Sequence, residues 1–122
     1  MSAEQRPAGG TLYAAISNAI VGIVHDYTGR GPTRARTSIR EDVVVVMLQE
    51  TMLKAELSLV EDGKSDLVAH MRRSFQQTMR ADMSAAIEKL TGREVIAFMS
   101  DSHLEPDYSV EVFVLAPDGS AG

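Results

Sequence analysis

The chain of 122 residues contains no cysteine, which excludes disulfide bonds, thiolate metal sites and cysteine nucleophiles together. It also lacks a long apolar run. The most apolar stretch, residues 12–24, is interrupted by Ser17 and Asn18 and is shorter than the about 20 residues that a spanning helix needs. Residues 1–10 hold no apolar segment of the kind found in signal peptides. These absences predict a soluble, cytoplasmic protein without a transmembrane segment.

Positive charge is scarce as well, because 12 Lys and Arg residues stand against 17 Asp and Glu residues. The net charge of −5 argues against non-specific nucleic-acid binding, which depends on a basic surface. The charge is unevenly distributed. Five acids and no Lys or Arg follow from Asp101 onward, whereas Arg30, Arg34, Arg36 and Arg40 fall within eleven residues.

The tripeptide Thr-Gly-Arg occurs twice, at Thr28-Gly29-Arg30 and Thr91-Gly92-Arg93. Each copy follows a helical pattern and precedes two strand-like runs. The order predicts two helix–strand–strand repeats, with Gly29 and Gly92 in the left-handed conformation that commonly ends a helix.

In the first repeat, apolar residues at helical spacing predict a helix over residues 11–27, capped by Thr11. Its stripe comprises Leu12, Ile16, Ile20, Ile23 and Tyr27, widened by Val21 and Val24. Gly31 and Pro32 then form a turn, because proline cannot continue the helix. Residues 35–40 and 43–48 predict a hairpin turned at Glu41-Asp42, whose second strand is apolar on both faces and therefore central or covered twice.

In the second repeat, residues 65–90 predict the longest helix, capped by Ser65 and preceded by a short helix over residues 52–60. The long helix carries the stripe Val68, Met71, Phe75, Met79, Met83, Ala86 and Leu90. Residues 94–100 and 108–115 predict a second hairpin, joined by residues 101–107.

These patterns predict an α+β fold in which a four-stranded, mostly antiparallel sheet carries the two long helices on one face. We expect a single domain over residues 11–116, with disordered tails at residues 1–10 and 117–122. The first helix and residues 43–48 are more apolar than one layer of helices can hide. This excess predicts a homodimer.

Arginines beside a glycine-rich turn suggest an anion site, since guanidinium groups and backbone N–H groups together bind anions. The candidate residues are Arg30, Arg34, Arg36, Arg73 and Arg80. The structural alternative is favoured for the turn itself, because phosphate loops open a helix and these glycines close one. For Arg73 and Arg80, a solvated helix face is the corresponding alternative.

Alternating acids and a histidine, Asp101, His103, Glu105 and Asp107, would share one side of an extended segment and could bind a divalent metal. A hairpin loop whose aspartates bond backbone amides is the competing interpretation. We expect no metal and no cofactor. No Ser–His–Asp or Cys–His pattern is present, so the sequence offers no catalytic residue.

Several sequence blocks, in this order and spacing, resemble the MpsC-type domain of the Na+-translocating membrane-potential-generating system over residues 15–115. The blocks are Tyr27-Thr28-Gly29-Arg30-Gly31-Pro32, Asp42-Val43-Val44-Val45, Ala55-Glu56 with Leu59, Arg72-Arg73-Ser74-Phe75, Leu90-Thr91-Gly92-Arg93, Met99-Ser100-Asp101-Ser102-His103 and Val112-Phe113-Val114-Leu115. The chain departs from the pattern at Leu53 and Leu57, where the family has a Thr cap and a charged residue. This departure makes the short middle helix more apolar at its surface.

The resemblance implies a small bacterial cytoplasmic component associated with membrane modules linked to sodium, membrane potential and inorganic-carbon uptake, and no catalytic residues. Two functions follow. The first is a non-enzymatic accessory or regulatory module that binds a membrane complex, at the inner face of the membrane, or a copy of itself. The alternative is a small-anion or nucleotide-binding protein, or an enzyme, that uses the arginines. We prefer the first, because grouped arginines without a positioned base describe binding better than catalysis.

Overall fold

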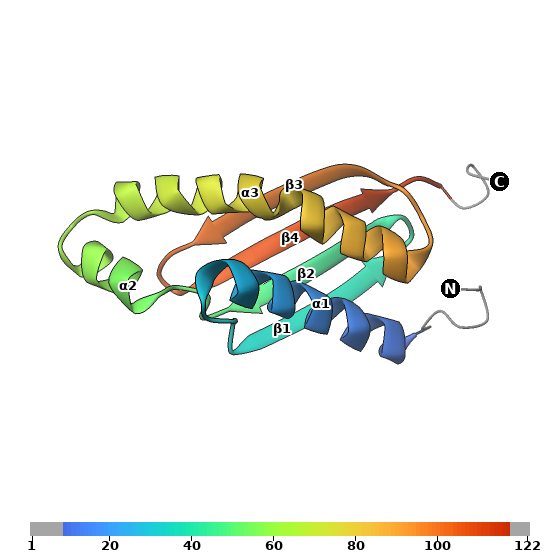
Figure 1. Ribbon diagram of the computed structural model, residues 1–122, viewed down its shortest axis with the longest axis horizontal. Coiled ribbons are helices and arrows are strands. Elements are labelled where there is room, and N and C mark those ends of the chain that lie inside the picture. Colours follow the sequence, from blue (N-terminus) through green and yellow to red (C-terminus); the bar gives the residue numbers. More distant parts are fainter. Residues whose placement is uncertain (1–8, 118–122) are drawn as a thin grey trace.

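The computed structural model describes residues 9–117, which fold into three helices and four strands (Figure 1). In chain order the elements are α1 (Gly10–Thr28), β1 (Arg34–Arg40), β2 (Val43–Gln49), α2 (Lys54–Glu61), α3 (Ser65–Thr91), β3 (Val95–His103) and β4 (Tyr108–Leu115). The predictions for residues 1–8 and 118–122 lie outside the described residues.

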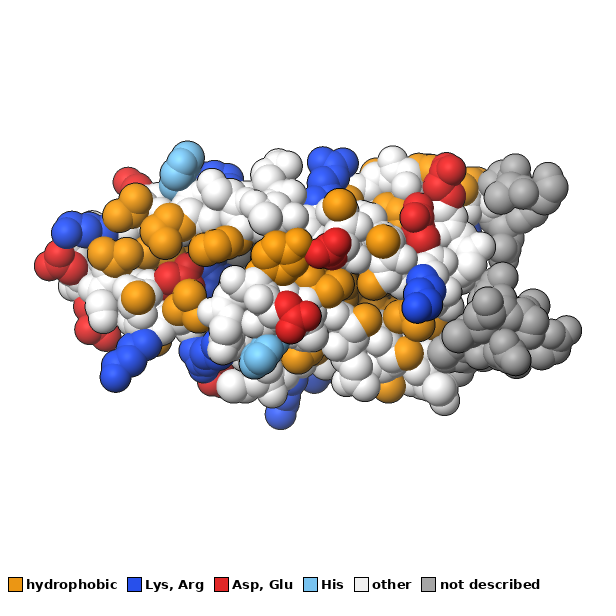
Figure 2. All heavy atoms as spheres, viewed as in Figure 1, with side chains coloured by type: hydrophobic (Ala, Val, Ile, Leu, Met, Phe, Trp, Pro, Cys, Tyr) orange, Lys and Arg blue, Asp and Glu red, His pale blue; other side chains and the backbone are white. Residues whose placement is uncertain are grey.

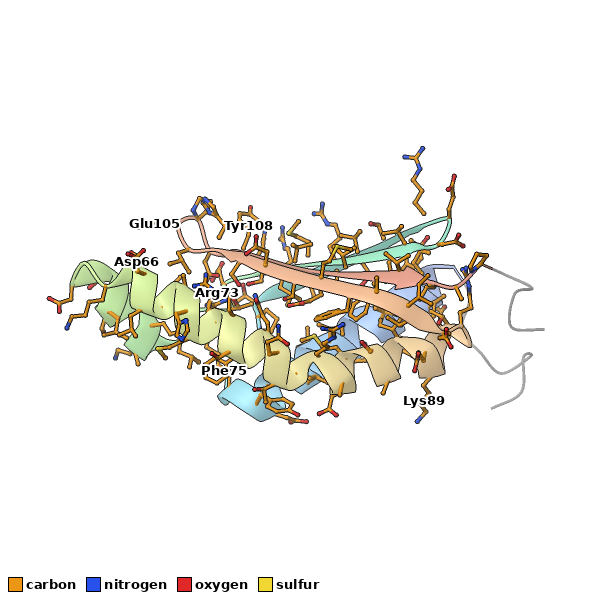
Figure 3. All side chains as sticks on the ribbon, turned by 90° about the horizontal axis from the view of Figure 1, so that it is seen from above. Asp66, Arg73, Phe75, Lys89, Glu105 and Tyr108 are labelled. Carbon is orange, nitrogen blue, oxygen red and sulfur yellow. The ribbon has the colours of Figure 1, made fainter. Side chains whose placement is uncertain are left out.

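The four strands form one antiparallel sheet in the order β1-β2-β4-β3. Both hairpins therefore join through their second strands, and β1 and β3 form the two edges. Seen edge-on, the sheet carries all its helices on one side, while Tyr108 lies on the other (Figure 3). The α+β fold class and the single layer of helices are confirmed.

Burial alternates along each strand. The sheet therefore has a covered face, which the helices pack against, and an open face on the other side. Val44, Val46 and Leu48 of β2 and Phe113 and Leu115 of β4 are at most 1% exposed beneath the helices. They pack with Ile16, Ile20 and Val24 of α1 and with Met79, Met83 and Ile87 of α3. Strand β2 is central, as its composition predicts, but helices cover only one of its faces within residues 9–117.

The two long helices lie side by side over the sheet and are joined at their surface by a hydrogen bond. The hydroxyl of Tyr27 donates to Asp82 Oδ2 at 2.6 Å, and this bond raises the pKa of Tyr27. Tyr27 is 40% exposed, so Val24 rather than Tyr27 supplies the buried position at that end of α1.

Both Thr-Gly-Arg copies adopt the same local geometry. Thr28 and Thr91 each donate their hydroxyl to the carbonyl four residues earlier at 2.7 Å, and Gly29 and Gly92 have φ angles of 79° and 70°. The following arginine N–H groups bond back to the threonine oxygens at 3.3 and 3.2 Å. The repeat therefore reflects a shared way of ending a helix before a hairpin.

Three boundary predictions are wrong. Helix α1 begins at Gly10 with Gly9 as its N-cap, and Lys64 precedes α3, so neither Thr11 nor Ser65 is a cap; no side-chain bond caps either helix. Strand β3 continues to His103, so Asp101 and His103 are strand residues, and the connection is only residues 104–107. Pairing with β4 supplies the hydrogen bonds that extend β3.

The helix face has an apolar end. Leu57 of α2 and Leu67 of α3 are 44% and 48% exposed, and hydrophobic side chains gather on this face around α2 and the start of α3 (Figure 2). Among the described residues, no helix is both long enough and apolar enough to cross a bilayer.

Candidate functional site

The structure places the five candidate arginines in three separate locations. Arg30 lies in the turn after α1 and donates from Nη1 to the carbonyl of Met52. Arg34 and Arg36 lie on the open face of the edge strand β1. Arg73 and Arg80 lie on α3, which packs beside the opposite edge strand β3. Arg30, Arg34 and Arg73 therefore do not converge on one ligand.

Two of these locations are hollowed. Arg34 and Arg36 line a depression of about 470 Å³ on the open face, together with Ser38, Val45, Met47, Gln49 and Tyr108. Arg73 and Arg80 line one of about 170 Å³ against Phe98 and Ser100. The guanidinium of Arg80 lies 5.9 Å from the centre of the Phe98 ring, a cation–π distance.

The possible metal ligands also separate. Asp101 and His103 share the open face of β3, and His103 Nδ1 lies 2.8 Å from the carbonyl of Pro106. Asp107 instead accepts a hydrogen bond from the N–H of Met52 at 2.8 Å, as the loop interpretation anticipates for an aspartate. Within residues 9–117 no three His, Asp or Glu side chains are placed to hold a metal ion together.

The glycine turn is held against α1. A Cβ on Gly31 would lie 3.3 Å from Val21 Cγ1, a tight contact that the valine side chain could relieve only by shifting a few tenths of an ångström. Arg30 binds the Met52 carbonyl beyond β2, and Arg93 likewise binds the Ala116 carbonyl beyond β4 at 2.7 Å. In both repeats the arginine after the glycine donates a hydrogen bond to a backbone carbonyl just beyond the second strand of the hairpin that follows it.

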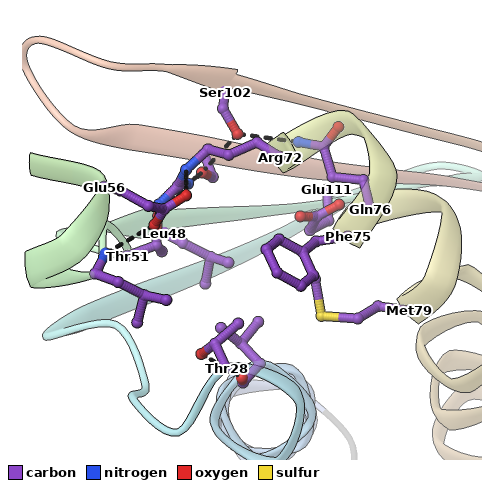
Figure 4. Close-up of a pocket in the computed structure, with 13 residues that line it drawn as sticks. Thr28, Leu48, Thr51, Glu56, Arg72, Phe75, Gln76, Met79, Ser102 and Glu111 are labelled. Atoms are coloured by element: carbon purple, nitrogen blue, oxygen red, sulfur yellow. Dashed lines mark hydrogen bonds and ion pairs between the residues drawn. The ribbon is translucent and has the colours of Figure 1, made fainter. Parts of the chain in front are cut away.

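A small cavity of about 40 Å³ lies between α1, α2, α3 and the covered face of the sheet (Figure 4). Its polar wall is a network centred on Arg72, which is 9% exposed. Arg72 donates Nε–H to Glu56 Oε2 at 3.3 Å and Nη2–H to Glu56 Oε1 at 3.2 Å. Its Nη1 donates to Thr51 at 2.6 Å and to Ser109 at 3.1 Å. Since Glu56 is 3% exposed, the pair forms a buried, neutralised salt bridge.

The network ties the short helix to the rest of the fold. Glu56 also accepts the N–H of Leu53 at 2.8 Å, which satisfies a free donor at the start of α2. Asp107 receives the hydroxyl of Thr51 at 3.3 Å, and Gln76 donates to Ser102 at 3.0 Å. Residues from α2, α3, β3 and β4 therefore share one set of polar contacts.

Glu111 is a second buried carboxyl group at this cavity, and it has no positively charged partner within residues 9–117. It is 3% exposed, and neither its Oε2 nor the Oγ of Ser100 has a hydrogen-bond partner among the described residues. Burial raises the pKa of Glu111 to about 7. Glu111 is therefore about half protonated near pH 7 and largely neutral below about pH 6 in the folded protein.

Residues 8–117 match the protein family described as "Na+-translocating membrane potential-generating system (MpsC)". The chain belongs to the MpsC family. It is also similar to "Uncharacterized protein YbcI" of Bacillus subtilis (strain 168), with 27% identity over 110 residues that cover 89% of each chain. No solved structure matches the chain. At the level of the family, membership associates the chain with the Na+ membrane-potential system.

In this MpsC chain the buried polar residues are those that the sequence analysis did not select. Two signals point to them. Arg72 lies four residues after Val68, on the buried side of α3, and Glu111 alternates with Ser109 and Phe113 along the covered face of β4. A charged residue in an apolar register is informative, because it is seldom buried without a partner or a function.

The cavity of this MpsC chain suits small polar species rather than organic substrates. A volume of about 40 Å³ holds a few water molecules. None of its lining residues is a histidine, and His25, His70 and His103 are all exposed. The serine and threonine hydroxyls at the cavity therefore have no imidazole base beside them within the described chain. The arrangement organises the fold and holds a titratable carboxyl group.

Proposed function

We propose that this chain is a non-enzymatic accessory or regulatory module of a Na+-translocating, membrane-potential-generating system. It acts in the cytoplasm, at the inner face of the membrane, by binding other protein chains, and it self-associates as a homodimer. Family membership supports the link to the membrane system. The observation that carries the mode of action is the open face of the sheet, where Met47 of the central strand β2 and Met99 of the edge strand β3 are 38% and 53% exposed.

The open face is apolar along its centre. Val43, Val45 and Met47 of β2 lie beside Val110, Val112 and Val114 of β4, and no described element covers them. Uncovered apolar patches beyond a few hundred Å² mark interaction sites in soluble proteins. The buried cavity, by contrast, offers salt-bridge and hydroxyl groups without a positioned base.

The test of the accessory role uses cells that carry the natural membrane system. Deleting the gene should lower the Na+-dependent membrane potential of inverted vesicles, and added purified protein should restore it. The tagged chain should co-purify with the Na+-translocating subunits. Unchanged Na+-dependent potential after deletion, with the other subunits at normal abundance, contradicts the proposal.

A second candidate function is binding of a small anion or nucleotide, and the hollow lined by Arg34 and Arg36 favours it. Phosphate, bicarbonate and nucleotides should then raise the melting temperature, and the rise should disappear in Arg34→Ala with Arg36→Ala. Arg73→Ala provides the matched control, because Arg73 lies by the other edge of the sheet. If none of the three ligands moves the melting temperature, this second function is excluded for them.

A further inference from the structure

The strand register arranges the open face in rows that run across the sheet. Arg36 pairs with Met47, Met47 with Val110, and Val110 with Asp101. The next row toward the β1–β2 turn runs Ser38, Val45, Val112 and Met99. Each row therefore begins at edge strand β1, crosses two apolar residues and ends at edge strand β3.

Charge divides between the two edges of this face. Arg34, Arg36 and Arg40 project from β1, and all three are exposed. At the other edge Asp101 is exposed, and its Oδ1 accepts the N–H of Ser102 at 2.8 Å. No ion pair joins any of these four residues to another described residue.

The acids of the second hairpin cannot neutralise the arginines within one chain. Asp101 lies three strands away from Arg36, about 14 Å at the usual spacing of about 4.8 Å. Glu111 is buried on the covered face, and Asp107 bonds Thr51 and the N–H of Met52. Among the described residues, therefore, Asp101, Asp107 and Glu111 leave Arg36 without an acidic partner, and an acid on a second chain could supply one.

We propose that a second copy of the chain covers the open face, related by a two-fold axis that runs parallel to the strands between the two sheets. The proposal rests on the self-association given as part of the proposed function and specifies its geometry. This axis places each edge strand over the opposite edge strand of the second copy. Each row of residues then lies over the same row of that copy. Each β1 then lies over β3 of the second copy, and Arg36 of each chain meets Asp101 of the other.

Charge favours this axis over the other in-plane axis. A two-fold axis across the strands would place each β1 over β1 of the second copy with the rows reversed, so that Arg34 would meet Arg40. Six arginines would then gather along one rim, where the Arg34–Arg40 contacts repel and Arg36 meets only Ser38. With the axis parallel to the strands, the apolar centres also coincide, because Val45 lies over Val112 and Met47 over Val110. Aligned sheets pack in this manner about 10 Å apart.

A charge exchange tests the geometry, because it restores binding only between two different variants. In Arg36→Glu both contacts between residues 36 and 101 of the homodimer become acid against acid. In Asp101→Arg the same two contacts become base against base. Mixed together, the two variants again oppose unlike charges at both contacts. We expect each variant alone to dissociate at least about tenfold more readily than wild type, and the mixture to form a heterodimer of near wild-type affinity.

The measurement is analytical ultracentrifugation at low and physiological salt, with wild type expected at twice the chain mass of 13.2 kDa. Arg73→Glu, an exposed change on α3, is the control that should leave the dimer intact. Melting curves verify folding of each variant. A monomeric wild type overturns self-association itself. A wild-type dimer that is indifferent to both exchanges, or a mixture that stays monomeric, overturns only the proposed axis.

Discussion

Arg72 and Glu56, sixteen residues apart, form a two-pronged salt bridge in which Nε and Nη2 donate to the two carboxylate oxygens at 3.3 and 3.2 Å. Both side chains are buried, so each charge is compensated mainly by the other. The pair fastens α2 to α3, and its stability depends on the presence of both members.

Arg72→Met should therefore destabilise the protein by about 3–5 kcal/mol, because it leaves the Glu56 carboxylate buried without a partner. The double variant Arg72→Met with Glu56→Gln should recover much of that loss. Urea denaturation of both variants and of Glu56→Gln completes the cycle. Equal losses in Arg72→Met and the double variant would contradict the explanation.

The buried carboxyl group of Glu111 predicts a pH dependence of stability. Its pKa is raised from 4.5 to about 7, so the folded state holds more protons than the unfolded state between those values. The free energy of unfolding therefore falls as pH rises across that window and levels off above it. The loss is of order 3 kcal/mol, at about 1.4 kcal/mol per pKa unit.

Glu111→Gln should remove this dependence. Urea denaturation should find the variant more stable than wild type at pH 8, with a much smaller advantage at pH 5. Exposed Glu94, at the start of the same hairpin, provides Glu94→Gln as a control that should not alter the profile. An advantage of the same size at both pH values would exclude titration of Glu111 as the cause.

The left-handed glycines predict equivalent costs in the two repeats. Gly29→Ala and Gly92→Ala should each destabilise by about 1–2 kcal/mol, because a Cβ strains a residue with positive φ. Gly22→Ala is the matched control: Gly22 lies inside α1 with no neighbour near its missing Cβ, so alanine should stabilise by up to about 1 kcal/mol. Thermal melts of the three variants give the comparison.

The apolar centre of the open face predicts that a single charge there disrupts self-association. Met47→Lys should weaken the dimer by about tenfold or more, since the ammonium group would be buried opposite an apolar surface. Leu67→Lys is the control, because Leu67 is similarly exposed but lies on α3. Ultracentrifugation should find the first variant monomeric and the second unchanged, with both melting as folded proteins.

Periodicity predicted the strands and their faces because burial alternates along a strand as its sequence does. Thr37 and Ile39 face the helices and Arg36 faces outward, as the spacing indicates. The left-handed Gly29 and Gly92 were predictable for a similar reason, since the conformation is local. Properties that depend only on residues adjacent in the sequence could therefore be predicted from the sequence.

The polar cavity was not predictable, because its members become partners only in the folded chain. Glu56, Arg72 and Ser109 come from α2, α3 and β4, and a charged residue by itself indicates a surface position. The predicted N-caps were wrong for another reason. Thr11 and Ser65 are residue types that commonly cap helices, but both already lie inside the helix, because α1 begins at Gly10 and α3 begins at Ser65.

The described chain begins at α1 and finishes after β4 at one end of the molecule, while α2 and the turn before α3 lie at the other (Figure 1). That turn contains Gly63, which is exposed and has a φ of 79°. Joining residues 9 and 117 through a linker and opening the chain at Gly63 would give a circular permutant that starts with α3 and ends with α2. Because the two repeats meet through β2 and β4, the same architecture should be reached with the order of the repeats reversed.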